Sequence, residues 1–139
     1  MGKKITMYAA AAVVFLTAWL MMGASCSFST ANVKNALMTT GLDEYTRPVD
    51  KVDSFGLGSY VYLSAELHNA PDNTTITVVW YYEGEELDRI SFDNEGMTDT
   101  MIMSYMPPEM VTQTGNYSVA VFIDDRDKPD AAVDFTITE

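Results

Sequence analysis

Residues 59–67 read SYVYLSAEL, and this stretch determines which class of fold the chain can adopt. Apolar side chains occupy every second position from Val61 to Leu67, and Tyr60 and Tyr62 flank Val61. Alternation with a period of two is typical of a β-strand that has one buried and one exposed face. The stretch therefore predicts a strand whose tyrosines point away from the core.

Similar runs lie on both sides of this stretch and are separated by clusters of turn residues. They predict strands at residues 33–38, 75–82, 87–92, 98–106, 117–123 and 131–138, with a weak extension at 49–55. About seven short strands, with turn signals every 8–12 residues or so, are the pattern of an all-β sandwich. We expect antiparallel strands in two packed sheets, each with a polar outer face.

Residues 115–119 read GNYSV, which resembles the Gly-x-Tyr-x-Cys run of immunoglobulin domains, with Val119 at the cysteine position. Trp80, on an alternating strand, resembles the core tryptophan of the same domains. The resemblance covers about residues 32–138 and implies an immunoglobulin-like β-sandwich with Trp80, Tyr117 and Val119 in its core. The chain has one cysteine, so apolar packing has to replace the usual disulfide.

The N-terminal segment has the parts of a secretory signal. Two lysines precede an uncharged run over residues 5–22, and small residues lead to Cys26. The segment resembles a bacterial lipoprotein signal, although Gly23 stands where leucine is usual. That resemblance implies cleavage and acylation at Cys26. The alternative is an uncleaved anchor helix, because eighteen apolar residues are just enough to span a bilayer.

These observations divide the chain into three parts: a signal or anchor at residues 1–25, a short tether at 26–31, and the sandwich at 32–139. The predicted location is the extracytoplasmic face of a cell-envelope membrane, held by the lipid or the anchor. Ser27 follows Cys26 where an aspartate would favour the inner membrane, so we expect the outer membrane or the cell surface. The layout resembles small bacterial lipoproteins with one immunoglobulin-like domain, and this resemblance implies no activity.

Charge and composition narrow the functional class. Eight basic and twenty acidic residues give a net charge of −12, and loss of the two N-terminal lysines would make it −14. Nucleic-acid binding needs clustered lysine and arginine, so it is excluded. The single histidine, His68, has no marked catalytic partner, and no nucleophile motif is present. We therefore expect no enzyme and no cofactor, but a binding module for a protein or another envelope component.

Two clusters leave metal handling open as an alternative function. Five methionines fall within fourteen positions: Met97, Met101, Met103, Met106 and Met110. Thioethers can bind Cu(I), and Met101, Met103 and Met106 share one predicted strand, although methionines also fill cores. Four aspartates crowd a predicted hairpin tip: Asp124, Asp125, Asp127 and Asp130. Their oxygens could bind Ca²⁺, or the residues could simply favour a turn.

The expected contact surface of a binding module consists of exposed loops, a free sheet edge and aromatic side chains. Tyr60 and Tyr62 lie opposite the predicted core face. Exposed tyrosines on a sheet can form a ligand face, or they can pair across strands and stiffen the sheet. The sequence does not decide between these two roles.

Overall fold

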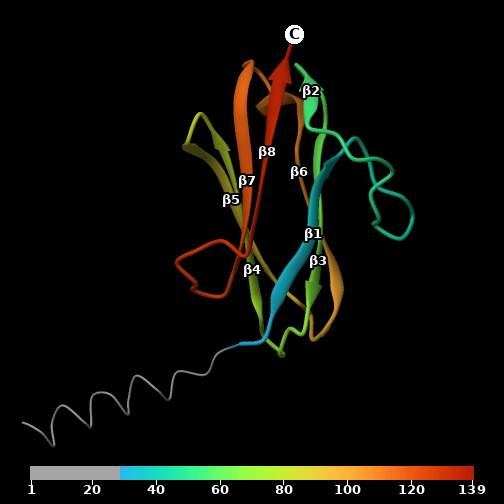
Figure 1. Cartoon of the computed structure of the whole chain (residues 1–139), viewed down its shortest axis with the longest axis vertical. Coiled ribbons are helices and arrows are strands. Elements are labelled where there is room, and N and C mark those ends of the chain that lie inside the picture. Colours follow the sequence, from blue (N-terminus) through green and yellow to red (C-terminus); the bar gives the residue numbers. More distant parts are fainter. Residues whose placement is uncertain (1–28) are drawn as a thin grey trace, which may run out of the picture.

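The computed structural model describes residues 29–139 of the chain (Figure 1). Cys26 and the predicted signal segment at residues 1–25 lie outside the described residues, so both remain predictions. Within the described part no helix is long and apolar enough to cross a bilayer. The elements are β1 (Asn32–Thr39), β2 (Ser54–Gly56), β3 (Val61–His68), β4 (Thr75–Tyr82), β5 (Glu85–Asp93), β6 (Thr100–Met106), the 3₁₀ turn η1 (Pro108–Met110), β7 (Gly115–Ile123) and β8 (Ala131–Thr138).

The strands form two sheets, which confirms the predicted all-β sandwich. The smaller sheet has the order β1-β3-β6, and the larger sheet has the order β2-β8-β7-β4-β5. Contacts between β1 and β8 join the sheets at one side. A hydrogen bond from Trp80 Nε1 to Ser104 Oγ (3.2 Å) places β6 across from β4. β5 therefore lies at the far edge of the larger sheet, beyond the last strand of the smaller one.

One strand pair departs from the predicted antiparallel arrangement. β2 pairs with the end of β8 in parallel, with Ser54 opposite Thr136. The weak extension predicted at residues 49–55 is reduced to these three residues at the edge of the larger sheet. The chain crosses from the smaller to the larger sheet before β2, and three residues carry no pattern that could signal a strand direction.

Alternating apolar side chains of both sheets meet in a single core. The inward positions of β3 are fully buried, at 0% exposure: Val61, Leu63, Ala65 and Leu67. Trp80 is 1% exposed, lies opposite Val119 in the β4–β7 register, and meets the ring of Phe135 edge-on at 6.0 Å. Such well-packed aromatic contacts contribute beyond the area they bury. The core thus stands without a disulfide, on packing between β3, β4, β7 and β8.

The start of β7 has the hydrogen bond of a tyrosine corner. The hydroxyl of Tyr117 donates to the carbonyl of Gln113 (2.7 Å), and burial raises the pKa of this tyrosine. Gly115 has a φ of +138°, and a Cβ there would lie 2.6 Å from Glu83 Oε1, so the position requires glycine. The sheet order and this corner agree with the resemblance described above. The fold is immunoglobulin-like.

Candidate functional site

The methionines predicted as Cu(I) ligands do not converge. On β6, Ile102, Ser104 and Met106 point into the core, whereas Met101 and Met103 point outward. Met106 is 1% exposed and Met103 is 42% exposed, so their sulfur atoms lie on opposite faces of the strand. Both faces of β6 carry apolar side chains, and for this reason the sequence could not show which face is buried.

The four aspartates of the 124–130 connection are not arranged around a common point either. Arg126 Nη1 donates to both carboxylate oxygens of Asp130 (2.8 and 2.6 Å), and its Nη2 donates to the carbonyl of Ser29 (3.1 Å). Asp124 accepts from the amide of Thr75 (2.9 Å). The guanidinium of Arg126 thus already neutralises the carboxylate of Asp130. Across residues 29–139, no three His, Cys, Asp or Glu side chains are grouped to hold a metal ion.

His68 is the last residue of β3. Its Nδ1 is 3.3 Å from Asp99 Oδ1, and its Nε2 is 3.9 Å from Glu66 Oε2. Asp99 comes from the connection before β6, so this partner could not be seen from neighbouring positions in the sequence. The contact links the end of β3 to the connection before β6.

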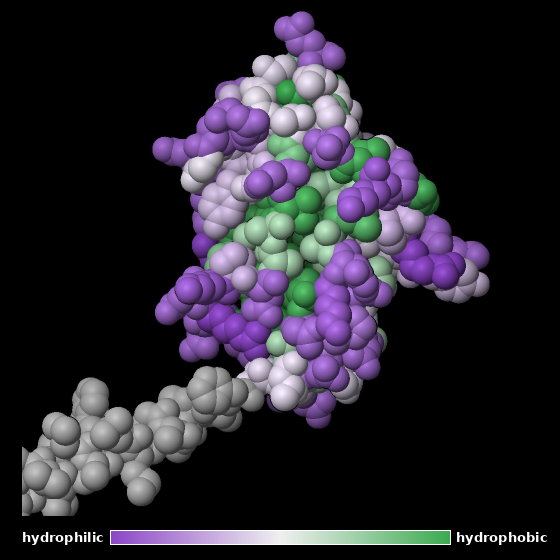
Figure 2. Space-filling model, in the orientation of Figure 1, coloured by the Kyte–Doolittle hydropathy of each residue, from purple (hydrophilic) through white to green (hydrophobic). Residues whose placement is uncertain are grey.

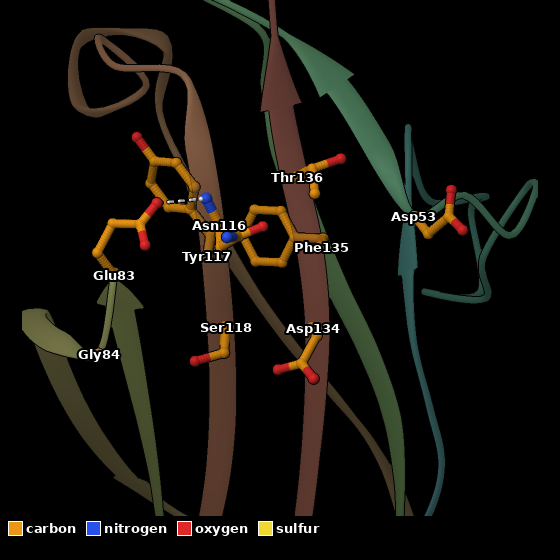
Figure 3. A pocket seen from close by; sticks show the side chains of 9 residues that line it. All are labelled: Asp53, Glu83, Gly84, Asn116, Tyr117, Ser118, Asp134, Phe135 and Thr136. Carbon is orange, nitrogen blue, oxygen red and sulfur yellow. Dashed lines mark hydrogen bonds between the residues drawn. The ribbon is translucent and has the colours of Figure 1, made fainter.

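A polar hollow lies over β7 and β8 (Figure 3). Its acidic side chains are Asp53, Glu83 and Asp134, and Glu83 Oε1 accepts the amide of Asn116 (2.9 Å). In Figure 3 the three carboxylates belong to three separate segments and are spread across the hollow. They do not face one another, so this acidic surface does not define a ligand.

Three tyrosines form a cluster on the outer face of the smaller sheet. The ring centroids of Tyr60, Tyr62 and Tyr105 lie 5.8 to 6.2 Å from one another. Tyr62 and Tyr105 are opposite each other in the β3–β6 register, so this is a cross-strand pair. As predicted, Tyr60 and Tyr62 point away from the core. About half of Tyr60 and Tyr105 stays exposed, which leaves an aromatic surface beside the edge of β6.

One side of the sandwich is open, and β5 lies along it. In the β4–β5 register, Ile90 lies opposite Val78 and Phe92 lies opposite Ile76, so all four occupy the face of the larger sheet that forms the core. Val78 and Ile76 are at most 1% exposed, yet Ile90 is 50% and Phe92 36% exposed. The difference arises because the smaller sheet ends at β6, across from β4. In the described part of the chain, core-facing side chains of β5 therefore have no strand above them.

A groove runs along this open side between β5 and β6. It consists of two hollows, of about 420 and 340 Å³, which both contain Phe92. Its lining also includes four of the five clustered methionines: Met97, Met101, Met103 and Met110. Ile90 and Asp88 line it from β5, and Tyr105 lines it from β6. Methionine side chains adapt to varied partners, which suits them to a binding surface.

On the opposite side of the sandwich a hollow of about 470 Å³ lies between β1 and β8. There β1 and β8 are in contact, and an apolar strip between them is visible in Figure 2. Its side chains include Ala36, Leu37 and Val133, which are all half-buried, and Met38, which is buried. The large exposed apolar side chains of the two sheet edges thus lie at the β5–β6 side, and this groove is the candidate functional site.

Comparisons with solved structures find domains of similar architecture. A CARDB domain from Pyrococcus furiosus, crystallised in complex with di-metal ions, is 11% identical, and the match covers 80% of this chain and 96% of that one (TM-score 0.48). An immunoglobulin-like protein from Pseudomonas aeruginosa is 13% identical over 78% of this chain and 96% of its own (TM-score 0.47). No protein-family model matches the sequence, and no curated protein is significantly similar to it. Likenesses this low say nothing about function.

Sequence reasoning anticipated a free sheet edge as a contact surface but did not find the groove. The available signal was β5 itself, where Ile90 and Phe92 alternate with polar residues in a strand of mixed charge. Such a pattern is typical of any half-buried strand. Only the pairing of β5 with β4, and the absence of a strand above it, show that the apolar half of the pattern is exposed.

Proposed function

We propose that this chain is a non-enzymatic binding module of the cell envelope, which binds a protein through the groove between β5 and β6. The observation that supports this most strongly is the exposure of Ile90 and Phe92 at core-facing positions. Single exposed apolar residues are ordinary, but an apolar groove along an unpaired sheet edge marks an interaction site. A free edge that is neither short nor covered would otherwise be an aggregation hazard.

A membrane anchor at the N-terminus would hold this module at the extracytoplasmic face. Support comes from the two lysines, the uncharged run at residues 5–22 and the small residues before Cys26. Several acyl chains anchor a protein stably where a single chain does not. A net charge of −14 without the two lysines would keep the domain clear of anionic lipid.

Replacing Cys26 tests the anchor, because the lipid is attached to its thiol. Intact-mass measurement of detergent-extracted protein should show a shortened, lipid-bearing chain, and Cys26→Ser should give an unlipidated precursor. A mass equal to residues 1–139 in both proteins would contradict the lipid anchor. It would favour the uncleaved helix and leave the binding groove unaffected.

Binding through the groove is tested with two matched variants of the full chain. Ile90→Ser removes an apolar side chain from the groove, and Val49→Ser removes one of similar exposure from the connection between β1 and β2. Each tagged protein is captured from its own solubilised envelope after cross-linking. We expect one partner to be captured by the native chain and by Val49→Ser, and to be lost with Ile90→Ser. Equal capture by all three would rule out the groove as the contact surface.

A further inference from the structure

Within residues 29–139, the strand order leaves room for one further strand on the open side of the sandwich. β1 faces β8 and β6 faces β4, so β3 lies over β7, and the next position beyond β6 lies over β5. A strand at that position would hydrogen-bond to the free edge of β6. Its inward side chains would cover Ile90 and Phe92, which the protein leaves half-exposed and about one-third exposed respectively.

We propose that an extended segment of another protein adds to the free edge of β6 as a fourth strand of the smaller sheet. The inference rests on the proposed function and names the form in which the partner binds. β6 reads TMIMSYM, without a charged residue or a proline to block edge pairing. Main-chain hydrogen bonds would supply affinity, and the groove would select side chains at alternate positions.

The side chains that line the groove define the chemistry of this segment. Two neighbouring inward positions would be apolar, to cover Ile90 and Phe92. The third inward position would be basic, because Asp88 shares their face and lines the groove. β5 carries four carboxylates against one guanidinium, and that guanidinium, of Arg89, is held by Glu86 (2.7 Å). An apolar strand with a lysine or arginine is therefore complementary to the groove in shape and in charge.

A second copy of the chain does not fit the position. A symmetric pair of β6 edges has its twofold axis normal to the sheet, so the two β4 strands would approach as closely as the two β6 strands. Each copy has β5 beyond β4, and the two β5 strands would then occupy the same space. Residues 29–139 also carry a net charge of −14, so two copies repel each other.

The described part of the chain enters the fold on the side away from this position. The described fold begins at residue 29 and continues directly into β1. β1 is at the edge of the smaller sheet away from β6, with β3 between them. A separate polypeptide is therefore the occupant that the geometry favours.

Synthetic peptides of seven residues, the length of β6, test the proposal with the full chain in detergent micelles. In both peptides threonine alternates with two valines and one lysine, and the lysine comes first in one and last in the other. One of them should bind saturably, whichever strand direction the site prefers. A version with proline at both the central valine and the threonine before it should not bind, because successive backbone N–H groups of a strand point to opposite edges and one of these two therefore faces β6. Binding of the proline version with equal affinity would overturn strand addition.

Protein variants report whether the peptide lies in the groove. Ile90→Ser should weaken binding about fivefold, because the peptide can no longer bury the exposed half of an isoleucine side chain. Phe92→Ser should act in the same direction, and Val49→Ser should change nothing. Asp88→Asn should weaken binding about two- to fivefold at low salt, and the difference should shrink as salt is added. Equal binding by Ile90→Ser, Phe92→Ser and the native chain would overturn the proposal.

Hydrogen exchange identifies the edge that the peptide joins. Amides of β6 that do not pair with β3 should exchange quickly in the free chain and become protected in the complex. Protection of β5 amides instead, or of β6 amides already in the free chain, would contradict the assignment. If no peptide binds but Ile90→Ser still loses the envelope partner, strand addition is wrong while the binding function stands.

Discussion

The buried hydrogen bond between Trp80 and Ser104 leads to a quantitative prediction about the contact between the sheets. The indole N–H donates across the sandwich to the hydroxyl of Ser104 at 3.2 Å, with Trp80 only 1% exposed. Ser104→Ala leaves this donor buried without a partner, which should cost about 1–3 kcal/mol of unfolding free energy. Trp80→Phe removes the donor, so adding Ser104→Ala to that variant should cost close to nothing. Trp80→Ala, which also leaves a cavity, should cost about 3–5 kcal/mol.

The four proteins of this double-mutant cycle can be compared by urea unfolding, followed by circular dichroism of the full chain in micelles. The coupling energy should be about 1–2 kcal/mol, and the dependence of the unfolding free energy on urea should stay the same in all four. A Ser104→Ala cost that is equal in both backgrounds would refute the reasoning. It would mean that the bond adds nothing and that β6 is not held over β4 in this way.

Further predictions concern the corner, its pH dependence and the two metal candidates. Gly115→Ala should lower the unfolding free energy by at least about 1 kcal/mol, as measured from urea midpoints. Gly58→Ala is the control and should cost less, because Gly58 also has a positive φ but a Cβ added there meets nothing within 4 Å. Burial raises the pKa of Tyr117 in the folded protein. The stability that this tyrosine contributes is therefore complete below its unfolded-state pKa of about 10, and it is lost as pH rises through the higher folded-state pKa. Urea midpoints should thus fall at alkaline pH, and less so in Tyr117→Phe. Calcium should not raise the melting temperature, because Arg126 already holds Asp130 in the connection; a clear rise would contradict this. Titration should show no sub-nanomolar Cu(I) binding, because the methionines of β6 lie on opposite faces of the strand; sub-nanomolar binding that is lost when all three are replaced with leucine would revive metal handling.

The fold was largely predictable because its signals are local. The alternation in β3, β4, β7 and β8 places apolar side chains on one face, and most of these side chains are buried, although Val133 is only half-buried. The tyrosine corner could be anticipated from residues 115–119, since a glycine with a positive φ and a tyrosine two positions later are close in sequence. In β6 the same reasoning failed, because methionine, isoleucine and tyrosine make both faces apolar.

The candidate site was only partly predictable. The clustered methionines stood out in the sequence, but a metal site was the chemistry they suggested. The structure distributes them along a groove and buries Met106 in the core. The aspartates likewise drew attention as a group, and their actual partners, Arg126 and the amide of Thr75, come from geometry that spacing does not encode.

The sequence by itself determined where the strands lie and which face of most of them is apolar, because both follow from a period of two within single strands. The tertiary structure alone decided which apolar faces are covered. Ile76 and Phe92 belong to the same sheet face and pair directly, yet one is buried and the other is exposed. Burial depends on whether a strand of the other sheet lies opposite, and that is set by five strands facing three. The groove exists for this reason, and no pattern within β5 or β6 could have shown it.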